Sequence, residues 1–161
     1  MLADRINSSI REVPDFPKEG INFKDITPLL MDPSLSLNIV NAFAESLDKL
    51  NIDAIVGIES RGFLFGFLLA QKMNLPFIPI RKAGKLPGEK ISYTYDLEYG
   101  SAEVEIHKKD IKKGWNIAIH DDLLATGGTA VAAAELIKCL GANVSAFTFV
   151  VELEFLDGKS K

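Results

Sequence analysis

Strand-like apolar runs alternate with segments of helical periodicity along this chain, and few folds accommodate that order. Residues 53–58 form a short β-branched run, residues 61–73 are apolar over helical length, and residues 76–81 are strand-like again. A helix precedes them, because apolar residues recur every three or four positions from Leu35 to Leu50 behind the start signal Asp32-Pro33-Ser34. The spacing predicts a helix followed by a strand–helix–strand unit.

A second strand–helix–strand unit is predicted in the C-terminal half. It consists of a strand-like run at 115–120, a helical face from Ala130 to Leu140 that ends at Gly141, and a last strand at 144–151. Strands this apolar, joined through helices, indicate a parallel sheet covered on both faces. The sequence therefore predicts an α/β fold with a doubly wound parallel sheet. Its 161 residues fit a single domain, 1–161.

Residues 82–110 interrupt this rhythm. The stretch is polar and has a predicted turn at Pro87-Gly88, after which aromatic and apolar residues alternate with polar ones. The alternating residues are Tyr93, Tyr95, Leu97 and Tyr99. We expect a β-hairpin here, in an excursion long enough to act as a lid over a site.

Composition excludes several classes of partner. With 18 basic and 22 acidic residues the net charge is −4, so the chain lacks the overall positive field of a nucleic-acid-binding protein. No apolar stretch approaches the roughly 20 residues of a membrane helix, so we expect no membrane partner. The single cysteine, Cys139, has no partner for an internal disulfide, which favours a cytoplasmic location; we expect it on a buried helix face.

The most informative segment runs from Ile117 to Thr129. It leads from a buried strand, through two acids, into a turn rich in threonine and glycine that opens a helix. The amides at a helix N-terminus attract anions, and glycines let the backbone curl around a phosphate. The hydroxyl groups of Thr126 and Thr129 can donate to phosphate oxygens. The segment therefore predicts a phosphate site at the carboxyl end of a sheet strand.

The two acids of this segment, Asp121 and Asp122, suit a sugar better than a phosphate, which they would repel. Their carboxylates can accept hydrogen bonds from ribose hydroxyls and can support positive charge that develops at the anomeric carbon. The alternative is that the acids only end a loop and that Gly127-Gly128 is a plain strand-to-helix turn.

This run resembles the phosphoribosyl pyrophosphate signature of type I phosphoribosyltransferases, in the form Asp-Asp-Leu-Leu-Ala-Thr-Gly-Gly-Thr of the adenine phosphoribosyltransferase family. Further blocks look like that family in the same order, at 15–20, 23–28, 59–66, 81–88 and 95–100. The resemblance extends from about Asp15 to Leu156. It implies a glycosyltransferase of purine salvage that converts adenine and phosphoribosyl pyrophosphate into AMP and pyrophosphate.

The resemblance also implies the roles of individual residues. Catalysis is expected of Asp121, Asp122 and Tyr95. The ribose 5′-phosphate is expected to bind to Ala125, Thr126, Gly127, Gly128 and Thr129. Pyrophosphate is expected to contact Glu59, Ser60, Arg61, Arg81, Lys82 and Lys85, with a cis peptide near Glu59-Ser60. Adenine is expected to contact Asn22, Phe23, Lys24, Leu123 and Ala125.

The residues taken one at a time leave other interpretations open. Arg61 could be a solvated helix start, and the basic residues from Arg81 to Lys85 could form a solvated loop. Phe23 and Leu123 could belong to the core, and Tyr93 and Tyr95 could serve only hairpin packing. Lys24 stands where the family commonly has arginine, and Tyr93 where many relatives carry glutamate. His120, normally apolar in the family, is expected to be a sheet-end histidine with a hydrogen bond.

The family further implies Mg²⁺ as the cofactor, held by the substrate and not by a protein cluster, and a homodimer. The reaction is expected to pass through an oxocarbenium-like state, shielded from water by the lid. Residues 1–31 are expected to form a small hood over the base. Two other functions remain open: transfer to another purine such as hypoxanthine or xanthine, and a noncatalytic regulator that senses phosphoribosyl pyrophosphate.

Overall fold

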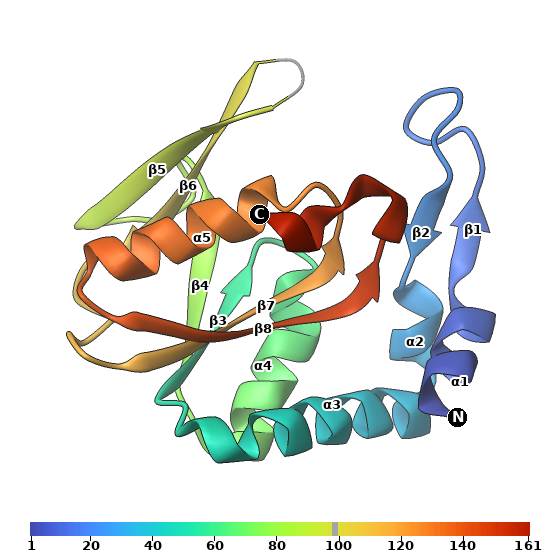
Figure 1. Cartoon of the computed structure of the whole chain (residues 1–161), viewed down its shortest axis with the longest axis horizontal. Coiled ribbons are helices and arrows are strands. Elements are labelled where there is room, and N and C mark those ends of the chain that lie inside the picture. The colour runs from blue at the N-terminus through green and yellow to red at the C-terminus, as the bar shows by residue number, and fades with distance from the viewer. Residues whose placement is uncertain (98–99) are drawn as a thin grey trace. The chain divides into compact units, whose positions relative to one another are not determined.

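The computed structural model describes residues 1–97 and 100–161 (Figure 1). Contacts within the chain separate a unit comprising Met1–Ala42 from a unit comprising Phe43–Lys161, and each is described by itself. Glu98 and Tyr99, which belong to the last of the family-like blocks, lie outside the described residues.

The N-terminal unit is built around a short antiparallel strand pair. It contains α1 (Leu2–Ser9), β1 (Arg11–Val13), β2 (Phe23–Asp25), α2 (Thr27–Met31) and the beginning of α3 (Pro33–Leu47). The carboxylate of Asp32 accepts the N–H of Leu35 at 2.9 Å, which confirms the predicted helix start.

The C-terminal unit holds a six-stranded sheet in the order β5-β6-β4-β3-β7-β8. Its strands are β3 (Ala54–Ile58), β4 (Phe77–Lys82), β5 (Lys90–Asp96), β6 (Ser101–His107), β7 (Asn116–Leu124) and β8 (Asn143–Glu152). The helical elements are α4 (Gly62–Met73), α5 (Gly128–Cys139) and the short 3-10 turns η1 (Asp48–Leu50), η2 (Glu154–Leu156) and η3 (Gly158–Ser160).

The four strands predicted as parallel are parallel, because β3 pairs with β4 and β7, and β7 pairs with β8. The predicted hairpin is also present, as β5 and β6. It does not stand apart from the sheet: β6 pairs with β4 in antiparallel fashion, so the sheet is mixed. The doubly wound α/β prediction is confirmed with this addition at one edge.

Two apolar layers cover the sheet, one on each face. Successive residues of a strand point to opposite faces of the sheet, so neighbouring residues enter different layers. Val56 and Ile119 lie on the α5 side, whereas Ile55 and Ala118 lie on the α4 side. Figure 1 shows α5 in front of the sheet and α4 behind it. The chain leaves β3 through α4 and leaves β7 through α5, so the two connections diverge between adjacent strands. Ligands of doubly wound sheets bind at such a switch point.

Strand β7 is longer than predicted. Its ladder with β3 ends at His120, but its ladder with β8 continues to Leu124. Asp121 and Asp122 therefore lie within the strand and not in a loop behind it, because β8 still offers a partner where β3 has already turned away. The backbone beyond His120 is unpaired on the β3 side, and a cavity opens there.

Two surface features bear on the expectations from sequence. Cys139 is exposed, so its predicted burial was wrong: it is the last residue of α5, where the helix leaves the sheet. Among residues 1–97 and 100–161, none of the helices has the length and hydropathy to cross a bilayer.

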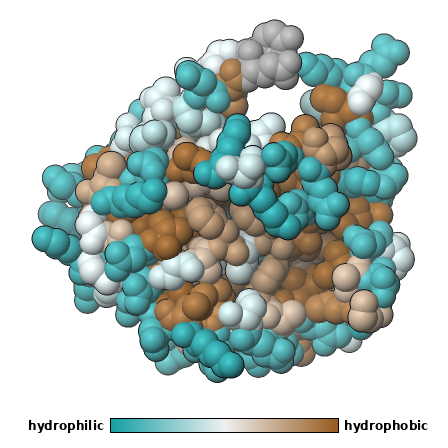
Figure 2. Space-filling model, in the orientation of Figure 1, coloured by the Kyte–Doolittle hydropathy of each residue, from teal (hydrophilic) through white to brown (hydrophobic). Residues whose placement is uncertain are grey.

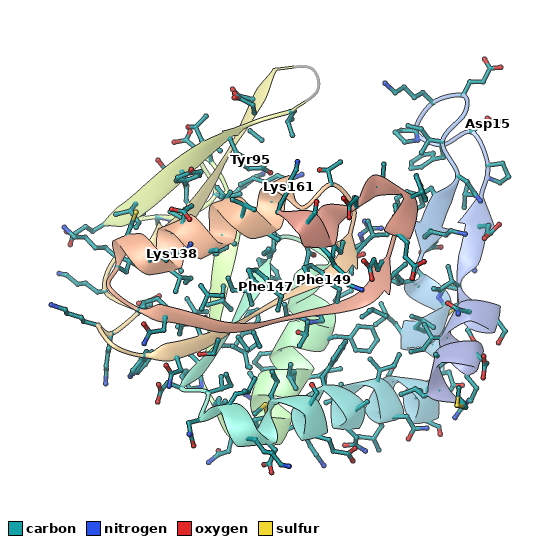
Figure 3. All side chains as sticks on the ribbon, viewed as in Figure 1. Asp15, Tyr95, Lys138, Phe147, Phe149 and Lys161 are labelled. Atoms are coloured by element: carbon teal, nitrogen blue, oxygen red, sulfur yellow. The ribbon has the colours of Figure 1, made fainter. Side chains whose placement is uncertain are left out.

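Figure 2 shows hydrophobic patches among hydrophilic residues on the surface. Figure 3 shows Phe147 and Phe149 side by side on β8, where the centroids of their stacked rings lie 6.2 Å apart.

Candidate active site

A cavity of about 330 Å³ opens at the carboxyl ends of β3, β4 and β7. Apolar residues that line it from the sheet include Ile58, Ile80 and Val104. The other lining residues are Glu59, Ser60, Arg61, Arg81, Lys82, Tyr95, Asp121, Asp122, Leu123, Ala125 and Thr129. Of the predicted pyrophosphate residues only Lys85 does not line the cavity; it is exposed.

The acidic pair lies on the floor of this cavity. Asp122 is 4% exposed and forms an ion pair with Arg61, with 3.0 Å between Oδ2 and Nε. The Oδ1 atom of Asp121 accepts the backbone N–H of Asp122 at 2.8 Å. Burial raises the pKa of Asp121, and the adjacent charge of Asp122 raises it further. In the absence of ligand the pair therefore retains a proton more readily than two separate carboxyls do.

The first turn of α4 presses against this pair. A Cβ atom at Gly62 would lie 2.9 Å from Oδ1 of Asp121 and 2.9 Å from the carbonyl oxygen of His120. Only glycine leaves room for α4 to start this close to β7. The N-terminus of α4, preceded by Arg61, thus brings positive charge to the acids.

Glu59 holds the cations of β4 in place. One carboxylate oxygen accepts a hydrogen bond from Nη2 of Arg81 at 2.8 Å, and the other accepts the backbone N–H of Lys82 at 2.7 Å. Burial alone would raise the pKa of Glu59, but these two donors outweigh it and lower that pKa. Glu59 is therefore charged, and its carboxylate orients Arg81. Arg81 and Lys82 both line the cavity, where they can face an anion. The peptide bond between Glu59 and Ser60 is cis, as the family resemblance implied.

The turn from β7 into α5 forms a second, smaller hollow of about 70 Å³. Its lining includes the whole predicted phosphate segment from Ala125 to Thr129. Gly127 precedes the helix with φ of +83°, and a Cβ atom there would lie 2.6 Å from the carbonyl oxygen of Gly158. Glycine is required on both counts. The free amides of the first helical turn are thereby exposed to a ligand in the hollow.

Tyr95 connects the hairpin with this turn. Its hydroxyl lies 3.0 Å from Oγ1 of Thr129, and Figure 3 shows it between the hairpin and α5. Tyr95 also lines the main cavity, whereas Tyr93 packs against the apolar core beside α5. Hairpin packing thus accounts for Tyr93, while Tyr95 combines packing with a position at the site.

The predicted adenine-binding set is drawn from both units of the chain. Leu123 and Ala125 line the cavity. Asn22, Phe23 and Lys24 belong to the N-terminal unit, where the carboxylate of Glu12 contacts the side chains of both Asn22 and Lys24.

The ring of Phe23 meets that of Phe16 edge-on at 5.2 Å. Phe16 is not among the residues predicted to contact adenine. Its only signal in the sequence is the Asp15-Phe16-Pro17 block that it shares with the family.

His120 is the buried sheet histidine that we expected. Its Nδ1 lies 2.8 Å from Oγ1 of Thr148, and Phe43 contacts its ring edge-on. Burial lowers the pKa of His120 to about 4, so the ring is neutral at pH 7. Within the described part of the chain, no three side chains of His, Cys, Asp or Glu are placed to hold a metal ion together.

Comparison with known proteins gives one consistent result. Residues 31–154 match the phosphoribosyl transferase domain. An adenine phosphoribosyltransferase of Christiangramia forsetii is 52% identical over 156 residues, which cover 97% of this chain and 91% of the relative.

Two solved structures of adenine phosphoribosyltransferases have nearly the same fold. The Thermoanaerobacter pseudethanolicus protein gives a TM-score of 0.95 at 48% identity, over 98% of this chain and 92% of that chain. The Saccharomyces cerevisiae protein, complexed with D-2,5-dideoxy-2,5-imino-altritol 1,6-bisphosphate and adenine, gives a TM-score of 0.94 at 47% identity, over 99% of this chain and 93% of that chain. The chain belongs to the phosphoribosyl transferase domain family and, within it, to the adenine phosphoribosyltransferases.

Proposed function

We propose that the chain transfers the phosphoribosyl group of phosphoribosyl pyrophosphate to adenine. The bond between the anomeric carbon and the pyrophosphate oxygen breaks, a bond from that carbon to a ring nitrogen of adenine forms, and the nitrogen loses its proton. The products are AMP and pyrophosphate. The observation that carries this proposal is that the acidic pair and the cations of β4 line one cavity, which shares Ala125 and Thr129 with the hollow at the predicted phosphate turn.

The ribose 5′-phosphate is proposed to occupy the hollow from Ala125 to Thr129. The amides of the first turn of α5 supply partial positive charge, and the hydroxyl groups of Thr126 and Thr129 supply further donors. The Tyr95 hydroxyl, hydrogen-bonded with Thr129, fixes the orientation of one of these donors. The remainder of the hairpin, within residues 82–110, is proposed to act as the lid.

Asp121 and Asp122 are proposed to bind the ribose hydroxyls and to support charge at the anomeric carbon. A sugar hydroxyl can donate to either carboxylate, and the oxocarbenium-like state is stabilised by negative charge held nearby in a site that excludes water. The ion pair with Arg61 orients the carboxylate of Asp122, which lines the cavity. Asp121 must lose its retained proton to contribute a full charge, which a bound cation would favour.

Pyrophosphate is proposed to leave toward Arg61, Arg81 and Lys82, where positive side chains line the cavity. Glu59 contributes by orienting Arg81, and Ser60 and the start of α4 contribute polar groups beside it. Lys85 is proposed to reach the same anion from the exposed loop that follows β4.

Mg²⁺ is proposed as the cofactor, since it prefers oxygen ligands and often binds through phosphate oxygens with few protein groups. The donors present fit this preference, because the carboxylates of Asp121 and Asp122 share the cavity with the predicted phosphate contacts. When bound with the substrate, Mg²⁺ supplies positive charge that neutralises pyrophosphate oxygens. The role of Asp121 and Asp122 toward it is to present carboxylate oxygens at the sugar side.

Adenine is proposed to lie against Leu123 and Ala125, which give the cavity an apolar wall near the acidic pair. The contacts expected from Asn22, Phe23 and Lys24 stay a prediction of the sequence. A cytoplasmic location, favoured by the single cysteine, is part of the same proposal.

A homodimer is proposed through the outer face of α4. Leu64, Phe67 and Leu68 are 42%, 51% and 45% exposed along this one helix, an apolar surface of the kind that a second copy covers. Light scattering during size-exclusion chromatography should give twice the chain mass. Phe67→Lys should shift the protein to monomer, while Leu37→Lys, at an equally exposed leucine of α3, should not.

The reaction is tested by measuring pyrophosphate release from phosphoribosyl pyrophosphate and Mg²⁺ with adenine, hypoxanthine, guanine or xanthine supplied separately. We expect turnover with adenine alone. Turnover with another purine would overturn the base assignment but retain the mechanism. Binding of phosphoribosyl pyrophosphate without any turnover would overturn the proposal in favour of a sensor.

A further inference from the structure

Glu105 is a buried carboxylate that the proposed mechanism does not use. It lies on β6, is 5% exposed, and faces Arg81 across the antiparallel ladder between β6 and β4. Burying a carboxylate is unfavourable unless donors satisfy both of its oxygens. The partners of Glu105 therefore indicate why a charge is placed there.

The positive groups around Glu105 come from the loop that follows β4 and from Lys90, the first residue of β5. Burial alone would raise the pKa of Glu105, but the N–H of Gly84, the ammonium group of Lys90 and the N–H of Leu86 outweigh it and lower that pKa. The Nζ atom of Lys90 lies 3.3 Å from Oε2 of Glu105. The same Nζ donates to the carbonyl oxygen of Leu86 at 2.9 Å. The carboxylate of Glu105 thus forms an ion pair with Lys90, whose ammonium group also holds the loop at Leu86, and the amides of Gly84 and Leu86 favour the charged form of Glu105.

Two further contacts hold the same loop. His107, two residues along β6 and on the same face as Glu105, places its Nε2 atom 2.8 Å from the carbonyl oxygen of Pro87. Arg81 donates from Nη1 to the carbonyl oxygen of Lys85 at 3.3 Å. His107 and Arg81 hold the loop as donors to its carbonyl oxygens, whereas Glu105 offers it two acceptor oxygens.

We infer that Glu105 is a positioning residue for pyrophosphate: it shapes the loop 83–89 so that Arg81 and Lys85 are presented to the leaving group. The inference rests on the proposed function. A carboxylate suits this task because its two oxygens only accept. In glutamine one oxygen is replaced by an NH₂ group, which would face amide and ammonium donors and be repelled by them.

The test compares Glu105→Gln with Glu103→Gln, the same change at an exposed glutamate of the same strand. Steady-state kinetics with adenine and phosphoribosyl pyrophosphate, and calorimetric binding of phosphoribosyl pyrophosphate with Mg²⁺, are measured for both variants and the wild type. Glu105→Gln should raise KM and Kd for phosphoribosyl pyrophosphate about tenfold, as expected for a lost charge-assisted contact. The KM for adenine should stay within about twofold, and Glu103→Gln should match the wild type.

A general structural defect would affect both substrates. Equal increases in KM for adenine and for phosphoribosyl pyrophosphate would therefore overturn the inference, as would unchanged binding in a folded Glu105→Gln protein. If Glu105→Gln does not fold, Lys90→Met replaces it in the test. Lys90→Met keeps the carboxylate of Glu105 and should raise the Kd for phosphoribosyl pyrophosphate by a smaller factor, about threefold. Hydrogen exchange should be faster in peptides covering 83–89 in both variants, and unchanged exchange there would count against the inference.

Failure of the proposed function has a different signature. If the wild type does not turn over adenine, the reaction is wrong, but the ratio of Kd values between Glu105→Gln and the wild type still tests Glu105.

Discussion

Asp121→Asn should make the ligand-free protein more stable while it impairs catalysis. The native environment raises the pKa of Asp121 through burial and through the charge of Asp122. A proton bound to the native state is therefore released by the unfolded state near the ordinary carboxyl pKa of about 3.9. The stabilisation that this proton provides is complete below that pH and is lost as pH rises toward the native pKa.

The change of the unfolding free energy with pH sets the expected size of the effect. A difference of one bound proton changes the unfolding free energy by about 1.4 kcal/mol for each pH unit. Asparagine at this position does not titrate and keeps an Oδ1 acceptor for the N–H of Asp122. As pH rises from 5 to 7, the unfolding free energy of the variant should therefore increase relative to that of the wild type by up to about 3 kcal/mol. Turnover should fall at least about tenfold through the lost charge.

Urea unfolding at pH 5, 6 and 7, without substrate or Mg²⁺, measures this difference. Asp48→Asn, at an exposed aspartate of η1, is the control and should show no pH-dependent gain. Effects of titrating groups that do not contact Asp121 are common to wild type and variant and cancel in the comparison. A constant difference between Asp121→Asn and the wild type across the three pH values would refute the reasoning.

Three further substitutions test other parts of the site. Glu59→Gln should raise KM for phosphoribosyl pyrophosphate about tenfold in steady-state assays, because Arg81 loses a charged partner; an unchanged KM would contradict that role. Gly127→Ala should lower the unfolding free energy by more than about 1 kcal/mol, whereas Gly128→Ala, where a Cβ meets only ordinary contacts, should cost less in the same urea titration. His120→Gln should lose less stability than the wild type as pH falls from 6.5 to 5, because the lowered pKa of the histidine makes the native state resist protonation; parallel curves would exclude this.

The elements of the sheet were predictable because each depends on local pattern. The apolar run at 53–58 became β3, and the start signal at Asp32 became the cap of α3. What could not be predicted is how distant elements pair. No local signal places β6 beside β4, because the choice of strand neighbours depends on the whole chain.

In the candidate site, too, local sequence predicts some features, and the pairing of distant residues determines the others. The turn from β7 into α5, where we propose a phosphate site, was recognisable because its glycines, threonines and helix start are adjacent in sequence. The contact between Glu59 and Arg81 joins residues 22 positions apart, and the sequence placed both at pyrophosphate without indicating that one holds the other. Cys139 was misplaced because helical periodicity predicts a face of the helix but not where the helix leaves the sheet.

Glu105 shows the limit most clearly. In the stretch from Ser101 to His107, apolar residues alternate with charged ones, a pattern that places Glu105 on a solvated face. The residue is buried because the loop after β4 folds over that face and supplies the donors that a carboxylate needs. The alternation identifies the correct face of β6, but only the fold reveals what covers it. Buried charges of this kind are therefore where the structure adds most to a site whose main motifs are already visible in the sequence.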